Sequence, residues 1–162
     1  MPALDDPAEL RRQGSVDLLQ IVDTPSEERF DRIVEMARKL YRTETAVFAV
    51  VDRNRTWHKA RVGTLVEQVE RSNSFSSVIV QQCGPMIIAD AAADRRFRSN
   101  PAVSGKSGVR FYAGVPIVAP SGERIGALCV ADTKPRPAAS VDPSVLANLG
   151  RLIEAELRFR PE

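Results

Sequence analysis

The chain has 162 residues, of which 43% are hydrophobic and 27% are charged, and its formal net charge is +2 at pH 7. This is the composition of an ordinary globular protein, and so small a net charge gives no basis for nucleic-acid binding. The first residues lack a basic start and an apolar run, and no segment reaches the length of a membrane span. We therefore expect a cytoplasmic protein without membrane or nucleic-acid partners.

The first third of the chain carries two helical patterns. Residues 6–20 place apolar side chains among charges, which is typical of an amphipathic helix, and Gly14 is expected to interrupt it. Thr24, Pro25 and Glu27 then form a capping pattern, with threonine as the N-cap and glutamate reaching back to the free amide. Behind this cap, apolar residues recur at helical spacing: Phe30, Ile33, Val34, Ala37, Leu40 and Tyr41. The pattern predicts a helix with one face on a sheet.

Two strands are expected next. Residues 45–51 form a dense apolar run, and residues 56–62 alternate after a turn. The alternation puts Trp57, Lys59 and Arg61 on one face of the second strand. Trp57 either covers a pocket or packs against the next segment, and packing is the commoner role of an aromatic side chain.

The middle of the chain, residues 63–108, is largely polar and irregular. We expect it to contain a short helix from Phe75 and a short strand at residues 86–89. A helical turn follows at residues 94–97 and points Phe97 inward.

No motif predicts a metal or cofactor site. The single histidine, His58, has no second histidine or cysteine near it and is expected at the surface of an edge strand. Cys83 and Cys129 lack metal-ligand spacing and are expected to be reduced thiols. Residues 104–107 (SGKS) look like the end of a phosphate-binding loop, but Asn100 stands where that pattern needs a glycine. We therefore reject a nucleotide-triphosphate site.

Residues 109–132 form the centre of the chain, with two strands joined by a turn at Ser121-Gly122. If these two residues are the whole loop, Pro120 opposes Glu123 and the register follows. One face of the hairpin is apolar core: Phe111, Ala113, Val115, Ile117, Gly126, Leu128 and Val130. The other face has small and polar side chains with room above them, and it is the candidate site: Arg110, Tyr112, Gly114, Pro116, Ala127, Cys129 and Ala131.

The C-terminal part reads as a linker and a helix. Residues 134–139 are marked by prolines, and Asp142-Pro143 opens the helix as cap and first residue. Residues 158–161 are expected to end it. Its apolar stripe consists of Val145, Leu146, Leu149, Leu152, Ile153 and Leu157.

The central stretch resembles the core of GAF domains, in particular the bacterial branch attached to diguanylate cyclases and sensor kinases. The residues that carry the resemblance are RFYAGVPI from Arg110, the loop with Gly122, IGALCVAD from Ile125, and Pro135-Arg136. Further similar residues follow the family's order along nearly the whole chain: Asp23, Thr24, Pro25, Glu27, Glu28, Arg29, Phe30, Trp57, Lys59, Ala60, Arg61, Val62, Gly63, Asp90, Asp94, Arg95, Arg96, Phe97, Asn100 and Pro101.

We expect an α+β fold, and the resemblance implies the same arrangement. It is a GAF-like antiparallel sheet with the N- and C-terminal helices on one face and a loop and short-helix cover over a pocket on the other. We divide the chain into a helical extension, residues 1–22, and the GAF domain, residues 23–162. The branch usually has a cysteine and a histidine directly after the phenylalanine that matches Phe75. This chain has Ser76 and Ser77 there, so chemistry that depends on those residues is not expected.

The predicted ligand-binding residues are Trp57, Phe75, Ser76, Asp90, Phe97, Arg110, Tyr112 and Cys129. Arg110 has two interpretations. It either pairs with Asp90 or Asp94 of the covering segment, or it offers its guanidinium group to an anionic small-molecule ligand.

The resemblance leaves the ligand unidentified, because GAF domains bind cyclic nucleotides, tetrapyrroles, metabolites or nothing known, and we assign no cofactor. We expect a regulatory sensor that is not an enzyme and has no catalytic or metal-binding residue. Apolar stripes at both ends of the chain predict a homodimer joined by its terminal helices, which would act on a signalling effector domain or kinase. Two alternatives remain: an enzyme of the free methionine sulfoxide reductase kind, which would use pocket cysteines, and a dimerisation module with a collapsed pocket.

Overall fold

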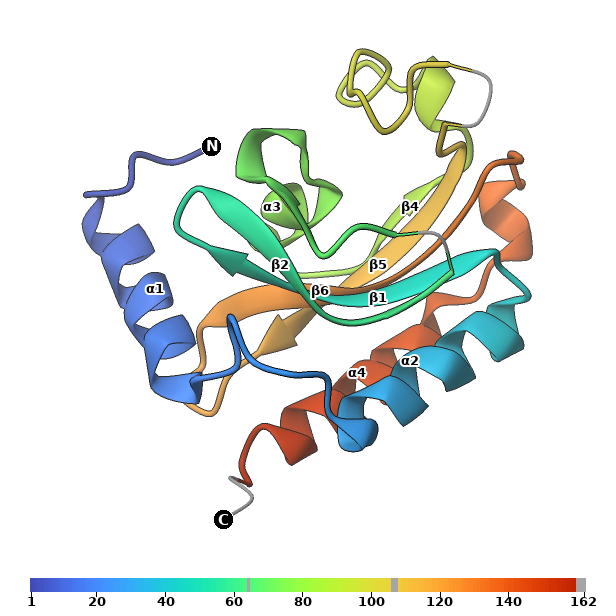
Figure 1. The fold of residues 1–162 in the computed structure, drawn as a ribbon. Helices are drawn as coiled ribbons and strands as arrows, with labels where there is room; N and C mark the ends of the chain where they lie inside the picture. The colour runs from blue at the N-terminus through green and yellow to red at the C-terminus, as the bar shows by residue number, and fades with distance from the viewer. Residues whose placement is uncertain (64, 106–107, 160–162) are drawn as a thin grey trace.

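The computed structural model describes residues 1–63, 65–105 and 108–159. In this part of the chain, one antiparallel sheet of six strands in the order β3-β2-β1-β6-β5-β4 forms the middle layer (Figure 1). The strands are β1 (Thr45–Asp52), β2 (Arg55–Val62), β3 (Gln68–Glu70), β4 (Met86–Ile88), β5 (Phe111–Val118) and β6 (Arg124–Asp132). The α-helices are α1 (Pro7–Leu19), α2 (Glu28–Tyr41), α3 (Phe75–Ile79) and α4 (Pro143–Glu156), and 3-10 turns lie at Arg71–Asn73, Ala91–Ala93 and Ala138–Ser140.

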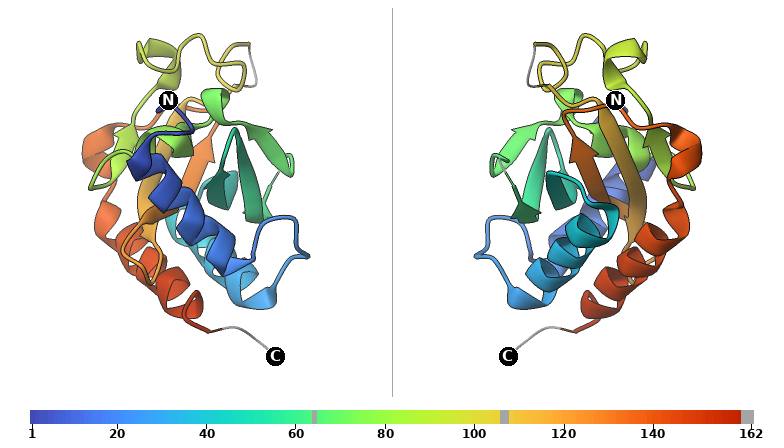
Figure 2. Two further views of the ribbon diagram at one scale, coloured as in Figure 1. Left: turned by 90° about the vertical axis from the view of Figure 1, so that its left-hand side faces the viewer. Right: turned by 90° about the vertical axis from the view of Figure 1, so that its right-hand side faces the viewer.

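Helices α2 and α4 lie side by side on one face of the sheet, and the segment that contains α3 lies on the other (Figures 1 and 2). The tyrosine Tyr41 at the end of α2 accepts a hydrogen bond from the amide of Leu146 near the start of α4, over 2.8 Å. Arg29 at the start of α2 contacts the end of α4, so the two helices run antiparallel. The expected α+β arrangement is therefore confirmed. No helix in the described ranges is both long and apolar enough to span a membrane.

The main core fills the space between the sheet and helices α2 and α4. Its centre is apolar and fully buried, with Phe30 and Phe48 packed at 5.3 Å between ring centroids. The predicted core face of the hairpin lies here: Phe111, Ala113, Val115, Ile117, Leu128 and Val130. That face assignment is confirmed.

The turn of the central hairpin differs from the prediction, although the predicted register is correct. Ile117 opposes Gly126, but Val118 opposes Arg124, because a β-bulge lies between them. The amide of Ala119 donates to the carbonyl of Glu123, which leaves a three-residue loop ending in Gly122 at φ 93°. A three-residue loop that ends in a left-handed glycine commonly carries such a bulge, and the extra residue on β6 restores the register that a two-residue turn would give.

Helix α1 is continuous through Gly14, so the expected interruption is wrong. Asp6 caps its first turn by accepting a hydrogen bond from the amide of Ala8. Unlike an ordinary amphipathic helix, α1 buries polar side chains against the body: Glu9, Arg12, Gln13 and Ser15, with Val16 as their apolar neighbour. The contacts of these buried polar side chains hold the helix in place. They stabilise the helical conformation of Gly14, although glycine has a low helix propensity.

Helix α2 begins at Glu28, and the predicted cap at Thr24 is wrong. The hydroxyl of Thr24 donates to the carbonyl of Ile21 over 2.5 Å and accepts from the Nζ of Lys59 over 2.6 Å. Glu27 forms an ion pair with Lys59 at 2.8 Å. A buried lysine thus recruits both polar groups of the capping pattern, and the helix starts only after them.

The cover, residues 71–105, lies over the second face of the sheet and passes through β4 at the sheet edge (Figure 1). It contains the predicted short helix from Phe75, the predicted short strand and a turn that buries Phe97. His58 was expected on an edge strand, but β3 pairs outside β2 and is itself the edge. Of the rejected phosphate-loop segment, residues 106 and 107 lie outside the described residues, as do residues 160 and 161 of the expected helix end.

Candidate ligand site under the cover

Tyr112 on β5 and Cys129 on β6 form the floor of the candidate site. Both side chains point from the sheet toward the cover, and both are buried. The Tyr112 hydroxyl lies 2.6 Å from the Sγ of Cys129, and the Oγ of Ser76 lies 3.8 Å from the same sulfur. The sheet and helix α3 thus bring one phenol, one thiol and one hydroxyl together.

Two further aromatic rings stack above the Tyr112 ring of this floor. The ring of Phe75 lies between those of Tyr112 and Phe97, with centroid distances of 4.5 Å and 4.4 Å. Phe75 is presented by α3 and Phe97 by the turn that follows the second 3-10 segment, so the stack joins the cover to the sheet. Five of the eight predicted site residues therefore meet: Phe75, Ser76, Phe97, Tyr112 and Cys129.

The room that Gly114 was expected to leave is filled. A Cβ atom built on Gly114 would lie 2.5 Å from the Cδ1 of Ile79 and 3.0 Å from the Tyr112 hydroxyl. The glycine therefore lets helix α3 approach the strand closely. The covered face is packed by the protein's own side chains, and glycine in the sequence could not distinguish close packing from an open pocket.

The polar floor is electrically neutral at ordinary pH. Burial raises the pKa of the Cys129 thiol to about 11, although hydrogen bonds with Tyr112 and Ser76 act in the opposite direction. Burial also raises the pKa of Tyr112 well above its usual value, and the neighbouring thiol adds to the effect. With the cover closed, both groups keep their protons and can only donate or accept hydrogen bonds.

Arg110 pairs with neither Asp90 nor Asp94, so the first of its two predicted interpretations is wrong. Its Nη1 donates to the carbonyl of Val103 over 2.6 Å, and its Nη2 donates to the carbonyl of Gly105 over 2.6 Å. The guanidinium group thus fixes the loop at the end of the cover through backbone carbonyls, with no acidic side chain among its hydrogen-bond partners in the described residues. Sequence patterns predict charged partners for arginine more readily than backbone ones.

Asp90 and Trp57 also lie outside the cluster. Asp90 caps the 3-10 turn at Ala91–Ala93 by accepting from the amide of Ala92 over 3.1 Å. Trp57 pairs with Val50, which belongs to the core under α2 and α4, so it lies on the opposite face of the sheet. A β-bulge opposite Phe48 and Ala49 shifts the alternation, so that Arg61 alone of the predicted trio faces the cover side.

A cleft opens beside the ring stack, between the start of the cover and the turn at residues 96–100. Its volume is about 410 Å³, and Phe97 forms part of its wall. Ser74, Ser77 and Asn100 give it a polar lining, and Arg96 places its guanidinium group 5.1 Å from the Phe97 ring centre. The sequence analysis missed Arg96 as a site residue, although its position directly before Phe97 was a usable signal.

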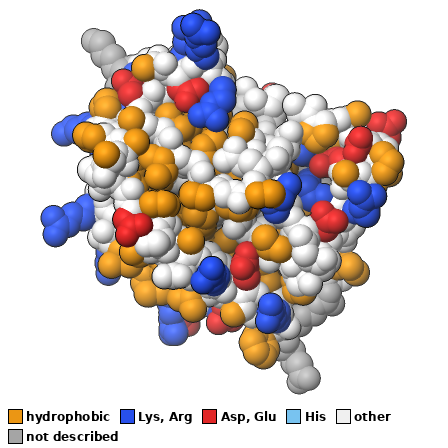
Figure 3. Space-filling view, turned by 180° about the vertical axis from the view of Figure 1, so that it is seen from behind, with side chains coloured by type: hydrophobic (Ala, Val, Ile, Leu, Met, Phe, Trp, Pro, Cys, Tyr) orange, Lys and Arg blue, Asp and Glu red, His pale blue; other side chains and the backbone are white. Residues whose placement is uncertain are grey.

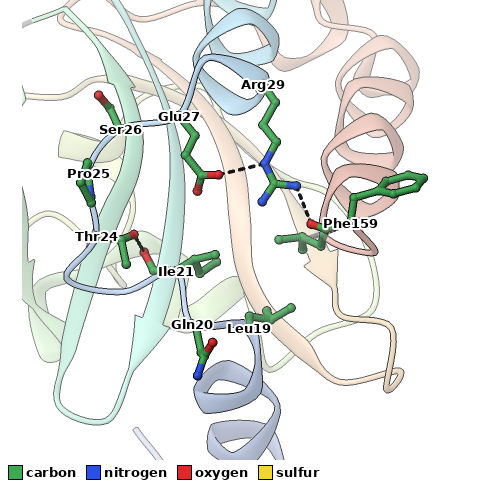
Figure 4. Close-up of a pocket in the computed structure, with 10 residues that line it drawn as sticks. Leu19, Gln20, Ile21, Thr24, Pro25, Ser26, Glu27, Arg29 and Phe159 are labelled. Atoms are coloured by element: carbon green, nitrogen blue, oxygen red, sulfur yellow. Dashed lines mark hydrogen bonds and ion pairs between the residues drawn. The ribbon is translucent and has the colours of Figure 1, made fainter. Parts of the chain in front are cut away.

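A second polar arrangement lies on the helix side and was also missed (Figure 4). The buried Lys59 binds Glu27, and Glu27 binds the Nε of Arg29 over 3.1 Å. Arg29 then donates to the carbonyls of Glu156 and Phe159 at the end of α4, over 2.5 Å and 2.8 Å. This Lys59–Glu27–Arg29 chain connects strand β2 to the last turn of the C-terminal helix.

Within the described ranges, no group of three or more histidine, cysteine, aspartate and glutamate side chains could hold a metal ion. The two cysteines are free, Cys129 buried and Cys83 exposed. The Sγ of Cys83 lies 3.2 Å from the Nη1 of Arg124.

Comparisons with known proteins place these features in a family. The family model described as GAF domain matches residues 25–157. A cyclic di-GMP phosphodiesterase of Pseudomonas aeruginosa is 36% identical over 147 residues, which are 90% of this chain. The chain spans about a quarter of that relative's length, since the match covers 25% of it.

Solved structures share the fold at low sequence identity. A type II free methionine-R-sulfoxide reductase from Thermoplasma acidophilum has a TM-score of 0.64 and 14% identity, with 80% of this chain and 90% of that chain covered. The GAF domain of an Acinetobacter phosphoenolpyruvate-protein phosphotransferase has a TM-score of 0.54 and 16% identity, with 94% and 96% covered.

These findings contradict the expectation that the chain is not an enzyme. A reductase shares its fold, and a relative at 36% identity is named a phosphodiesterase. The expectation depended on the absence of a catalytic motif, and it is withdrawn.

Proposed function

Because the chain belongs to the GAF domain family, we propose that it is a regulatory sensor domain whose ligand enters beside the cover. The observation that carries this proposal is the continuity between the 410 Å³ cleft and the ring stack. Phe97 belongs to both, and through Phe75 it contacts Tyr112 on the central strand β5. A ligand that displaces the Phe97 ring would therefore change the packing of the sheet.

The lining of the cleft suggests the chemical class of the ligand. Its volume lies within the range of small-molecule sites. Hydroxyl and amide groups predominate, so we expect a small polar molecule with a planar or apolar part that replaces Phe97 against Phe75. An anionic ligand would meet Arg96, and it would have to compete with Asp94, which binds that guanidinium group at 2.9 Å.

The signal would leave through the terminal helices of a homodimer. The Lys59–Glu27–Arg29 chain supports this path, because the buried Lys59 on β2 binds Glu27 and Arg29 binds the end of α4. Figure 4 shows the part of the chain from Glu27 through Arg29 to Phe159. We propose that residues 23–162 form the sensor unit and residues 1–22 its extension. The effector would be a signalling enzyme of the phosphodiesterase or kinase type, and the two free cysteines support a cytoplasmic location.

The sensor proposal is tested by ligand-dependent thermal stability. Purified protein is screened against nucleotides, amino-acid derivatives and small carboxylates, and native mass spectrometry checks for a co-purified molecule. We expect stabilisation by one class of compound that is lost in Arg96→Gln and kept or strengthened in Phe97→Ala, because the ring that the ligand must displace is then absent. It should be unchanged in Phe159→Ala, whose ring is 69% exposed. Binding that neither cleft variant alters would place the site elsewhere.

A second candidate is an enzyme of the free methionine sulfoxide reductase kind, and the structural neighbours favour it. In this chemistry a thiolate attacks the sulfoxide sulfur and, with uptake of a proton, takes over its oxygen as a sulfenic acid while methionine leaves. The sulfenic acid then condenses with a second thiol, which forms a disulfide and releases water. Cys129 would be the attacking group. The cover would first have to open, because burial is the largest cause of the raised pKa of this thiol.

The reductase candidate is tested by measuring turnover of free methionine-R-sulfoxide with a dithiol reductant. Activity that disappears in Cys129→Ser and changes its reductant dependence in Cys83→Ser would establish it. If the wild type and both variants are equally inactive over a range of pH, the sensor proposal stands alone.

A further inference from the structure

Helix α1 contacts the first residue of the cover through a buried ion pair. Arg71 begins the cover, and its side chain is fully buried. Its Nη1 binds the carboxylate of Glu9 on α1, and its Nη2 lies 3.3 Å from the second oxygen of that carboxylate. The Nη1 also donates to the carbonyl of Arg53 over 2.8 Å. Glu9 is the only acidic partner of Arg71 in the described ranges, so the buried guanidinium charge depends on α1 for compensation.

The turn at Arg71–Asn73 connects this ion pair to both walls of the ligand cleft. Helix α3 follows the turn and begins with Phe75 of the ring stack. On the other side of the cleft, the Nδ2 of Asn100 donates to the last carbonyl of the turn over 2.7 Å. The backbone amide of Asn100 donates to the carbonyl of Phe97 over 2.8 Å. A displacement of Arg71 therefore moves the segments that present both phenylalanines of the stack.

The N-terminal residues reach the mouth of the same cleft. Met1 is one of the residues that line it, together with Ser77 of α3. Its side chain is 64% exposed, so it lies at the rim of the cleft. In Figures 1 and 2 the N-terminus lies beside the segment that contains α3. Residues 1–19 thus contact the cover at its first residue and at the mouth of the cleft.

Helix α1 is held to the body mainly by polar contacts. It buries four polar side chains and one apolar side chain, Val16. Figure 3 shows the molecule from behind, where acidic and basic side chains lie next to one another at the right-hand end, on the side of α1, and apolar ones gather over the middle. Both partners of an ion pair regain water when they separate completely, so release of the whole helix costs less than removal of one charged partner. Helix α1 is therefore suited to leave the cover and return to it.

We propose that α1 is a latch on the cover. While Glu9 holds Arg71, the ring stack stays closed, and when α1 leaves, the cover lifts and the cleft opens toward Tyr112 and Cys129. This inference rests on the proposed function, because it describes how access to the same cleft is controlled. The coupling is reciprocal, so a ligand that binds the open cover favours the released helix by the same free energy. Residues 1–22 would then both control the entry of the ligand and respond to it.

The first experiment uses the thiol of Cys129 as a reporter, because this residue is 1% exposed under the closed cover. The full chain carries Cys83→Ser, which removes the exposed thiol, and labelling of Cys129 by N-ethylmaleimide is followed by mass spectrometry of its peptide. Glu9→Gln should accelerate the labelling by about tenfold or more, because Arg71 then loses its counter-charge. Phe30→Ala, which weakens the core on the helix side, should leave the rate unchanged, since its contacts stay intact when only the cover opens.

The second experiment holds α1 in place and leaves its ion pair intact. The Oγ atoms of Ser15 on α1 and Ser121 in the hairpin loop lie 2.6 Å apart, so cysteines at both positions are close enough to form a disulfide. Neither residue belongs to the cover, so the link acts on the cover only through α1. In the oxidised Ser15→Cys/Ser121→Cys protein, Cys129 should be labelled several-fold more slowly than in the Cys83→Ser parent. This comparison decides the case if Glu9→Gln does not fold.

Equal labelling with and without the disulfide, or a folded Glu9→Gln protein that is labelled at the rate of its parent, would show that α1 does not hold the cover. The inference would also be wrong if labelling of the parent had the full urea dependence of global unfolding, because the cover would then not open separately. The labelling needs no ligand, so these results leave the thermal-shift test of the sensor proposal untouched. A screen without any stabilising compound would remove the sensor proposal and leave the latch in place.

Discussion

Glu9 shows how one buried carboxylate can hold three parts of the chain. Burial raises its pKa, but hydrogen bonds and charge from Arg12 and Arg71 outweigh burial and lower the pKa to about 2. The carboxylate is therefore ionised throughout the physiological range. Because both arginines are almost fully buried, they depend on it for compensation.

We predict that Glu9→Gln lowers the free energy of unfolding by about 3 to 5 kcal/mol, because it leaves two buried guanidinium groups without a counter-charge. The folded pKa lies below the usual 4.5, so the wild-type contribution is present above that pH and is lost as the pH falls toward about 2. Urea titrations of both proteins from neutral to acidic pH measure this.

The matched control is Glu28→Gln, whose partner Arg32 is 72% exposed. Exposed pairs contribute only about 0 to 1 kcal/mol. A Glu9→Gln protein that loses no more stability than this control would mean that the ion cluster is worth no more than a surface pair.

Cys129 gives a second prediction, with the opposite sign of pH dependence. Its thiol pKa is raised from 9.0 to about 11 by burial, so unfolding releases a proton between these values. The stability that the neutral thiol contributes is complete below pH 9 and is lost as the pH rises toward about 11. The melting temperature of the wild type should therefore fall more steeply in this window than that of Cys129→Ala. Parallel curves would show that the thiol titrates alike in the folded and unfolded chain.

At the scale of elements, the last turn of α4 depends on a side chain from α2. Arg29 donates to the carbonyls of Glu156 and Phe159, which would otherwise lack partners at the helix end. We predict that Arg29→Ala costs about 1 to 3 kcal/mol, because charge-assisted hydrogen bonds are lost. Amides in the last turn of α4 should then exchange faster with solvent, as measured by NMR hydrogen exchange. Arg32→Ala, on the solvent side of the same helix, should leave α4 unchanged.

The elements themselves follow from local sequence more closely than their ends do. Asp142-Pro143 opens α4 as its pattern predicts, since the aspartate accepts from the amide of Ser144. The same kind of pattern fails at Thr24, where a lysine distant in sequence takes the hydroxyl. A cap can be predicted when no tertiary partner competes for it, and Lys59 could not be identified as that competitor before β2 was placed.

For the candidate site too, local sequence patterns predicted correctly only those features that do not depend on residues distant in sequence. Period-two alternation placed Tyr112 and Cys129 on the covered face, because the hairpin register survives its bulge. The face of Trp57 was predicted wrongly, because no residue type in the sequence indicates the β-bulge between β1 and β2. The acidic partner predicted for Arg110 was also wrong, because this side chain binds backbone carbonyls. Ile79 of α3 fills the space over Gly114. The sequence around Ile79 does not indicate that α3 packs against this strand, so the filled space could not be predicted.

At the scale of the whole molecule, the sheet separates two apolar clusters of different size. Both clusters include residues of the central strands β1 and β6, but the cluster under α2 and α4 is the larger. The cover cluster is smaller and includes residues of β4, a three-residue strand at the sheet edge. Regions with fewer buried contacts open locally at lower free energy than the whole protein unfolds. We therefore expect the cover to open as a unit while the helix side stays folded, which is the motion that either proposed function needs.

This expectation is tested with two matched phenylalanine variants and residue-resolved hydrogen exchange. Phe75 joins the cover to the sheet, and Phe30 is buried against Phe48 on the helix side. Either change to alanine should cost about 3 to 5 kcal/mol where the ring is buried. Phe30→Ala should reduce protection in β1 and β6 while α3 and β4 keep theirs, because the Phe30 contacts stay intact when only the cover opens. Phe75→Ala should reduce protection in α3 and β4 and also in β1 and β6, since the Phe75 contacts are lost both in the local opening and in global unfolding. If Phe30→Ala reduces protection in α3 and β4 by as much as in β1 and β6, the molecule opens as one unit and the cover is no independent gate.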